Sequence, residues 1–138
     1  MRRLLLGLLL GALVLTSCSD PAPTEQQTQS SGQSDQQFPD VVEVVAGRAE
    51  DGTFTFDVTM SSPYDTPERY ADGWRILGPD EEVYAEMTLD HDHAAEQPFT
   101  RTQTGVEIPD GVTSVVVEGR DLENGYGGGT QTVDLPTG

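Results

Sequence analysis

The chain has 138 residues, and its formal charge of −17 comes from 24 acidic side chains against seven basic ones, all of them arginine. Binding to nucleic acid needs a basic surface that displaces counterions from phosphates, and this composition excludes such a surface. The length allows one domain of ordinary size and excludes a large enzyme with a lid or a second domain. The charge therefore indicates a small acidic protein with no nucleic-acid partner.

An export signal stands at the N-terminus. Arg2 and Arg3 precede an apolar run at residues 4–15. A helix needs roughly 20 apolar residues to cross a bilayer, and a basic stretch before a shorter apolar run is typical of a secretory signal. We therefore expect residues 1–17 to be a signal peptide that is removed when the protein is exported.

The end of this leader carries a cysteine motif. Leu15, Thr16, Ser17 and Cys18 resemble the lipobox of bacterial lipoprotein precursors. The resemblance implies cleavage before Cys18 and lipid on its thiol, so that the membrane becomes a partner at the cell membrane or the outer membrane. Two or three acyl chains anchor a protein stably, at about 0.8 kcal/mol per buried methylene. The alternative is a stray cysteine near an ordinary cleavage site.

Residues 18–40 form the predicted tether. They consist almost entirely of Pro, Gln, Ser, Thr, Gly and acidic residues, with one aromatic side chain. Such a composition buries too little apolar surface to offset the entropy of ordering the backbone. We expect a disordered linker from the lipidated Cys18 to Asp40, followed by a folded domain at residues 41–138. Because Cys18 is the chain's one cysteine, no disulfide is expected within this domain.

The domain alternates between apolar and polar positions, as strands with one buried face do. The clearest case is residues 53–60, and residues 83–89 show the same pattern. The apolar faces consist of Phe54, Phe56, Val58 and Met60 in the first and of Val83, Ala85, Met87 and Leu89 in the second. Five further strands are predicted at residues 41–49, 73–77, 99–106, 115–119 and 130–135.

Seven short strands separated by turn residues are typical of an antiparallel β-sandwich, so the expected fold class is all-β. The domain resembles an immunoglobulin or fibronectin type III-like module. Trp74 falls on the third strand, where such sandwiches often place a core tryptophan, and residues 115–121 followed by 124–128 are similar to a fibronectin-type F strand and its hairpin. The resemblance implies a scaffold and no particular function.

One cluster of residues suggests metal chemistry. His91 and His93 are the chain's two histidines, and two residues apart they would point the same way if the strand continued through them. Glu96 follows in the same loop as a third ligand. Imidazole and carboxylate ligands suit Zn²⁺ or Cu²⁺. The alternative is a polar loop in which the histidines cap turns and bond to carboxylates.

The same loop carries a wider resemblance. His91-Asp92-His93 and the following Glu96-Gln97-Pro98-Phe99-Thr100-Arg101, with Gly125-Tyr126-Gly127-Gly128 later in the chain, are similar to a pattern in small, uncharacterised bacterial exported proteins. In that family a histidine often precedes the Gly-Tyr-Gly-Gly stretch. Here Asn124 takes that place. The resemblance implies membership of an exported family, and the asparagine weakens the metal interpretation.

Three other features have structural interpretations. Arg101 either clamps an anionic ligand or pairs with a neighbour such as Glu96. The glycine run at residues 125–129 follows a strand pattern with no helix after it, so it is expected to turn the chain and not to cradle a phosphate. The acidic residues at 80–82 and 121–124 lack the spacing of a calcium loop and are expected to be solvated turns.

Residue patterns of nucleophilic catalysis are missing, because the chain has no Gly-x-Ser-x-Gly elbow and no thiol beyond Cys18. We therefore expect a non-enzymatic protein. The first hypothesis is a lipid-anchored envelope module that binds a protein or glycan partner. The second is a lipoprotein that binds Zn²⁺ or Cu²⁺ through His91, His93 and Glu96, and otherwise no cofactor is expected.

Overall fold

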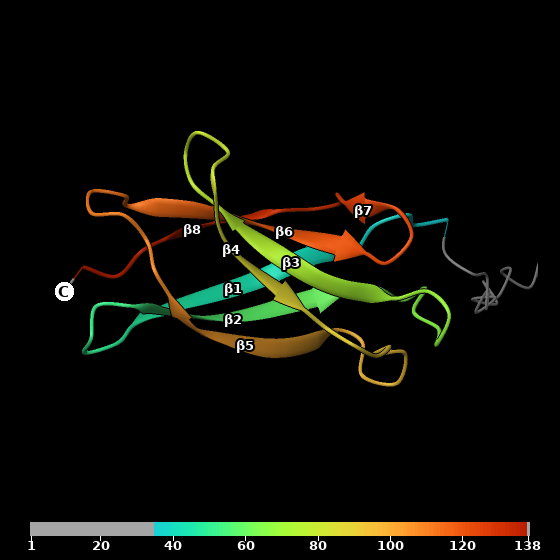
Figure 1. The fold of residues 1–138 in the computed structure, drawn as a ribbon. Coiled ribbons are helices and arrows are strands. Elements are labelled where there is room, and N and C mark those ends of the chain that lie inside the picture. Colours follow the sequence, from blue (N-terminus) through green and yellow to red (C-terminus); the bar gives the residue numbers. More distant parts are fainter. Residues whose placement is uncertain (1–34, 138) are drawn as a thin grey trace, which may run out of the picture. The chain divides into compact units, whose positions relative to one another are not determined.

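The computed structural model describes residues 35–137, and Figure 1 shows this part of the chain as strands and loops without a helix. The predicted signal peptide, Cys18 and most of the predicted tether lie outside the described residues. The strands are β1 (Asp40–Arg48), β2 (Phe54–Ser61), β3 (Ala71–Leu77), β4 (Val83–Thr88), β5 (Phe99–Val106), β6 (Ser114–Asp121), β7 (Gly125–Tyr126) and β8 (Gln131–Asp134).

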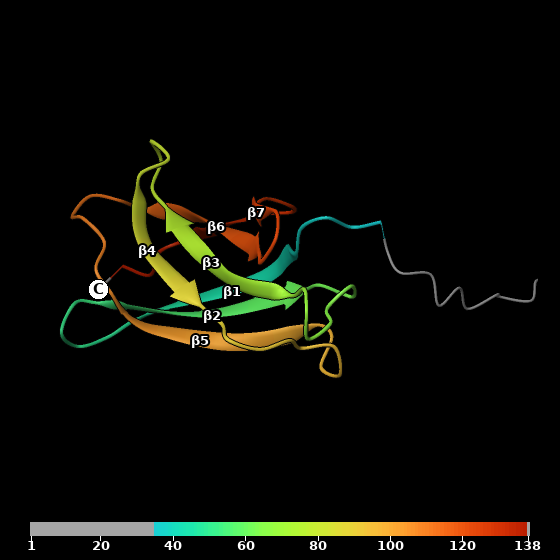
Figure 2. The ribbon, with the colours of Figure 1, turned by 45° about the vertical axis from the view of Figure 1, so that its right-hand side comes forward.

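The strands form two antiparallel sheets. One has the order β1-β2-β5, and the other has the order β4-β3-β6-β7, with β8 also pairing with β6. Figure 2 shows the two sheets as layers that face each other. The chain crosses between them after β2, β4 and β5. The prediction of an all-β fold built from two antiparallel sheets is confirmed.

The predicted number of seven strands is wrong, because the described residues contain eight. The additional strand is β7, which has two residues and folds back on β6 through the pairs Arg120 with Tyr126 and Asp121 with Gly125. It lies inside the glycine run that was expected to turn the chain. Composition predicts a loop there, whereas the pairing depends on a tight turn that Gly125 permits with a φ of 83°.

The core lies between the two sheets and follows the alternation of β2. Phe54, Phe56, Val58 and Met60 are all buried, as predicted. Opposite them, the indole of Trp74 is buried and donates a hydrogen bond from Nε1 to Oε1 of Gln103 at 2.8 Å. The amide of Gln103 donates to the backbone carbonyl of Glu86 at 3.1 Å. This chain of bonds connects β3, β5 and β4 across the sandwich.

The predicted apolar face of residues 83–89 is correct except at its first position. Ala85 and Met87 pack on the core and Leu89 is buried, but Val83 is 45% exposed. The register explains the difference. Ile76 pairs with Ala85, but Leu77 then pairs with Val83, so β4 has one extra residue at this point. A bulge of this kind breaks the period-2 alternation and places Val83 outside the core.

Candidate functional site

The histidine loop is the segment of residues 89–98 between β4 and β5. Because β4 ends at Thr88, the strand does not continue through the histidines, so the condition under which they were expected to point the same way is not met. The side chain of His91 is 63% exposed, and its Nδ1 lies 3.0 Å from Oδ1 of Asp90. The ring of His93 is buried and stacks on Phe99, with the ring centroids 3.8 Å apart.

The backbone N–H of His93 donates to Oδ2 of Asp65 at 3.0 Å, and Nδ1 of the ring lies 3.9 Å from the same oxygen. Both side chains are fully buried. Neither ring nitrogen of His93 has a hydrogen-bond partner among the described residues. Burial lowers the pKa of His93, and the positive charges of Arg101 and His91 lower it further. The ring is therefore neutral at pH 7.

Glu96, the third predicted ligand, pairs with Arg101 at 2.9 Å between Oε2 and Nη2. This hydrogen bond and the charge of Arg101 lower the pKa of Glu96. The predicted pairing of Arg101 with Glu96 is confirmed. Within residues 35–137 no three His, Cys, Asp or Glu side chains are grouped as ligands of a metal ion. The carboxylate that faces His93 is that of Asp65, and the site with Glu96 stays a prediction.

Gln97 fastens the histidine loop to the loop between β2 and β3. Its Oε1 accepts the backbone N–H of Ser62 at 2.7 Å, and its Nε2 donates to Oγ of Ser62 at 3.1 Å and to the carbonyl of His93 at 3.2 Å. Sequence reasoning missed Ser62 and Asp65, because both partners come from a distant loop whose polar residues look like ordinary turn residues. Gln97 itself was visible as part of the family pattern.

Asp121 was expected to belong to a solvated acidic turn, and this expectation is wrong because its side chain is fully buried. It accepts hydrogen bonds from the backbone N–H of Asn124 at 2.9 Å and from the Asn124 side chain at 2.6 Å, and Nε of Arg69 lies 3.2 Å away. Burial alone raises the pKa of Asp121, but the hydrogen bonds from Asn124 and the charge of Arg69 outweigh it and lower the pKa.

Residues before the predicted domain boundary take part in the fold. Nη2 of Arg69 donates to the backbone carbonyls of Gln36 at 3.2 Å and Gln37 at 2.8 Å. The side chain of Pro39 is fully buried, and β1 begins at Asp40. The last residues of the predicted tether are therefore held by Arg69 from the loop between β2 and β3, and Asn124 in the turn after β6 also donates to the carbonyl of Gln37 at 3.2 Å.

The glycine run receives this incoming segment. A Cβ added to Gly127 would stand 2.7 Å from the ring of Phe38, and one added to Gly128 would overlap the carbonyl oxygen of Pro39. The backbone N–H of Gly129 donates to Oδ1 of Asp40 at 2.6 Å. These glycines therefore do more than turn the chain as predicted, because they let residues 38–40 lie directly on their backbone.

We expect Gly128→Ala to destabilise the domain by roughly 2–3 kcal/mol, because the new methyl group collides with Pro39 and the backbone φ of 88° disfavours it. Gly52→Ala is the matched control: Gly52 has the same φ of 88°, but a Cβ there meets no atom within 4 Å. Denaturant unfolding of both variants measures the two free energies. Equal losses would show that residues 38–40 do not pack on the glycine run.

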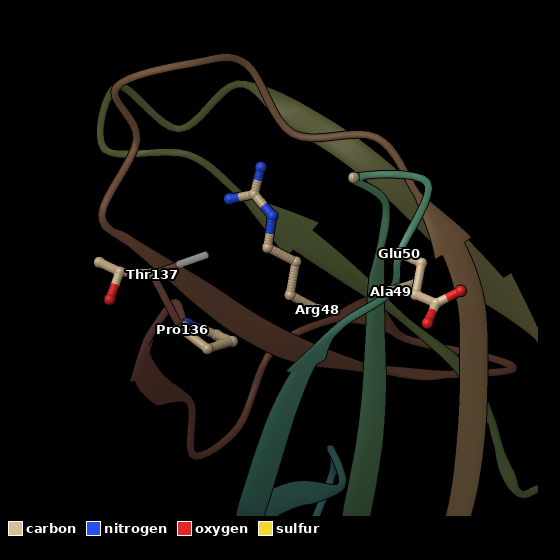
Figure 3. A pocket seen from close by; sticks show the side chains of 6 residues that line it. Arg48, Ala49, Glu50, Pro136 and Thr137 are labelled. Carbon is tan, nitrogen blue, oxygen red and sulfur yellow. The ribbon is translucent and has the colours of Figure 1, made fainter.

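Two open hollows share Arg48 at the end of β1. Figure 3 shows the Arg48 side chain between the turn at Ala49 and Glu50 and the C-terminal residues Pro136 and Thr137. Asp51, Glu107 and Asp110 line the second hollow. Among the described residues, Arg48 is the one arginine recorded in no ion pair. The hollows combine one cation with several carboxylates, and in the second hollow the hydroxyl of Thr53 donates a hydrogen bond to Oδ1 of Asp51 at 2.7 Å.

The described residues include no helix long and apolar enough to cross a membrane. No family model matches the chain, and no solved structure matches it. The chain is 34% identical over 119 residues to a protein of Halomicrobium mukohataei named "Putative lipoprotein". The match covers 86% of this chain and 58% of that relative, so the chain spans somewhat more than half of the relative's length.

Proposed function

We propose that the protein is an exported lipoprotein, held at the cell membrane or outer membrane by lipid on Cys18. The observation that carries this proposal is the lipobox at residues 15–18, which joins a basic, apolar leader to the chain's one cysteine. The relative's name supports it. The match extends over more residues than lie between Asp35 and the end of the chain, so it includes part of the N-terminal region.

In this proposal residues 19–35 are a flexible spacer between the lipid and the domain. For such a coil of about 17 residues, a typical reach is roughly 20–25 Å. Arg69 and the glycine run hold the end of the spacer, because they bind the backbone of Gln36 and Gln37 and receive Phe38 and Pro39. The domain is therefore displayed close to the membrane surface, with the spacer joined to it at a defined point.

We infer an immunoglobulin or fibronectin type III-like scaffold for the domain. The first, second and fifth strands share one sheet, and the third, fourth, sixth and later strands share the other. The single tryptophan is buried on the third strand, which agrees with the resemblance. Such a scaffold serves many functions, so its assignment supports a binding or structural module without naming the partner.

The domain's proposed role is to bind another envelope component, a protein or a glycan, without catalysis. The buried carboxylate of Asp121 supports this role, because it accepts a hydrogen bond from the domain's own backbone and is used for structure. The hollows around Arg48 are open, which suits contact with a surface or a chain better than enclosure of a small substrate.

The lipid anchor is tested by Cys18→Ser in cells that export the protein, with Ser19→Ala as the matched control. We expect the wild-type protein and Ser19→Ala to be in the membrane fraction and to require detergent for release. Cys18→Ser is expected to lose lipid-dependent processing and to run at the size of the precursor. Membrane-bound Cys18→Ser with unchanged processing would contradict the proposal.

A further inference from the structure

The ring of His93 occupies an unusual position for a structural histidine. A neutral imidazole carries one N–H donor and one acceptor, and buried polar atoms are normally bonded. Both ring nitrogens of His93 are buried and have no hydrogen-bond partner among the described residues. The ring lies flat on the ring of Phe99, and this stacking contact uses neither nitrogen. The unprotonated nitrogen is thus available to a ligand that the fold itself does not supply.

A carboxylate stands beside this ring at a distance that suits a shared metal ion. Oδ2 of Asp65 lies 3.9 Å from Nδ1 of His93. Zinc binds imidazole nitrogen and carboxylate oxygen at about 2.0–2.2 Å, so two ligands of one tetrahedral ion stand roughly 3.4 Å apart. Closing this gap needs a shift of about half an ångström. Two backbone hydrogen bonds hold the Asp65 carboxylate beside the ring: Oδ1 accepts the N–H of Ala71 at 3.0 Å, and Oδ2 accepts the N–H of His93 at 3.0 Å and has a second lone pair for a metal ion.

His91 is the available third ligand. Its ring centroid lies 4.7 Å from that of His93, and its side chain is mostly exposed. Its hydrogen-bond partner is the exposed Asp90, so turning the ring toward His93 and Asp65 breaks one surface contact. The carboxylates of Asp90 and Asp92 add negative potential that favours a cation. Glu96 forms an ion pair with Arg101 and is not one of the three proposed ligands.

We propose that His93, Asp65 and His91 come together as a binding site for one divalent transition-metal ion of the Zn²⁺ and Cu²⁺ class. As they are placed among residues 35–137 the three side chains do not yet form a ligand group, so the proposal requires His91 to turn toward the other two. His93 and Asp65 face each other from two loops that Gln97 fastens together, and His91 completes the site by rotation of an exposed side chain. The site differs from the one predicted from sequence, because Asp65 replaces Glu96 as the carboxylate ligand.

Calorimetric titration with Zn²⁺ and Cu²⁺ tests the site on the full chain in detergent, with Cys18→Ser present so that no thiol competes. We expect a 1:1 complex with a Kd below about 10 μM, and a lower Kd for Cu²⁺ than for Zn²⁺. His91→Ala is expected to weaken binding at least about tenfold, as is His93→Phe, which keeps a ring on Phe99. Glu96→Gln is the matched control and is expected to change the Kd less than about threefold.

The electron paramagnetic resonance spectrum of the Cu²⁺ complex gives a second measurement that does not depend on the stability of the His93 variant. Two imidazole nitrogens bound to copper are expected in the wild-type chain, and one in the chain with His91→Ala. Absence of binding below about 10 μM would overturn the proposal. A loss of affinity in Glu96→Gln as large as that in His91→Ala would also overturn it, because Glu96 would then be the carboxylate ligand.

Discussion

Replacing Trp74 by alanine is expected to lower the free energy of unfolding by about 3–5 kcal/mol, the usual cost of removing a large aromatic side chain from a packed core. The indole is fully buried between the two sheets, and its N–H connects β3 to Gln103 of β5. Truncation therefore leaves both a cavity and an unpaired amide oxygen. Guanidinium unfolding followed by far-ultraviolet circular dichroism measures the loss, since the variant has no tryptophan to report by fluorescence.

Two further variants separate packing from hydrogen bonding at this position. Trp74→Phe keeps an aromatic ring but removes the donor to Gln103, and we expect it to cost less than Trp74→Ala. Adding Gln103→Leu to Trp74→Phe removes the unpaired acceptor, and the double variant is expected to regain part of that loss. A change of less than about 1 kcal/mol in Trp74→Ala would contradict the placement of the indole in the core.

The second large effect is expected at Asp121. Asp121→Ala removes a buried carboxylate that accepts two hydrogen bonds from Asn124 and pairs with Arg69, which in turn holds Gln36 and Gln37. Breaking a buried pair by removing one partner typically costs about 3 kcal/mol or more. We expect a loss of that size in the free energy of unfolding, with Asp80→Ala in an exposed turn as the control.

The same carboxylate predicts how stability depends on pH. The folded state lowers the pKa of Asp121, so its ionised form stabilises the fold at pH values above the pKa in the unfolded chain, which is about 4. This contribution is lost as the pH falls below about 4 and the carboxylate takes up a proton. Unfolding curves of Asp121→Asn are expected to show a shallower acid dependence than those of the wild type. An unchanged acid dependence would assign the effect to other carboxylates.

Local alternation was sufficient to predict most strands and their buried faces. Phe56 and Val58 belong to a period-2 pattern of apolar residues with threonines on the other face, and this pattern indicates a strand with one buried face. The pattern failed at Val83, where a bulge that depends on the partner strand shifts the register. It also missed β7, because two residues are too short to produce a pattern.

Contacts between distant segments explain what sequence reasoning could not find at the candidate site. Asp65 and Gln97 are 32 positions apart, and both are polar loop residues whose partners become evident only in the folded state. Asp121 looked like a solvent-exposed turn residue because neither Arg69 nor Asn124 marks it as buried. The glycine run was recognised, but the segment at residues 38–40 that lies on it resembled the end of a linker.

The lipid anchor is tested most directly by mass spectrometry of the protein's N-terminal peptide after purification from membranes. Because the chain has no lysine, trypsin cuts next after Arg48, which gives one peptide from the mature N-terminus to that residue. We expect this peptide to begin at Cys18 and to carry the added mass of lipid on that residue. A peptide that begins at another residue, or one in which Cys18 carries a free thiol, would contradict the proposed lipoprotein.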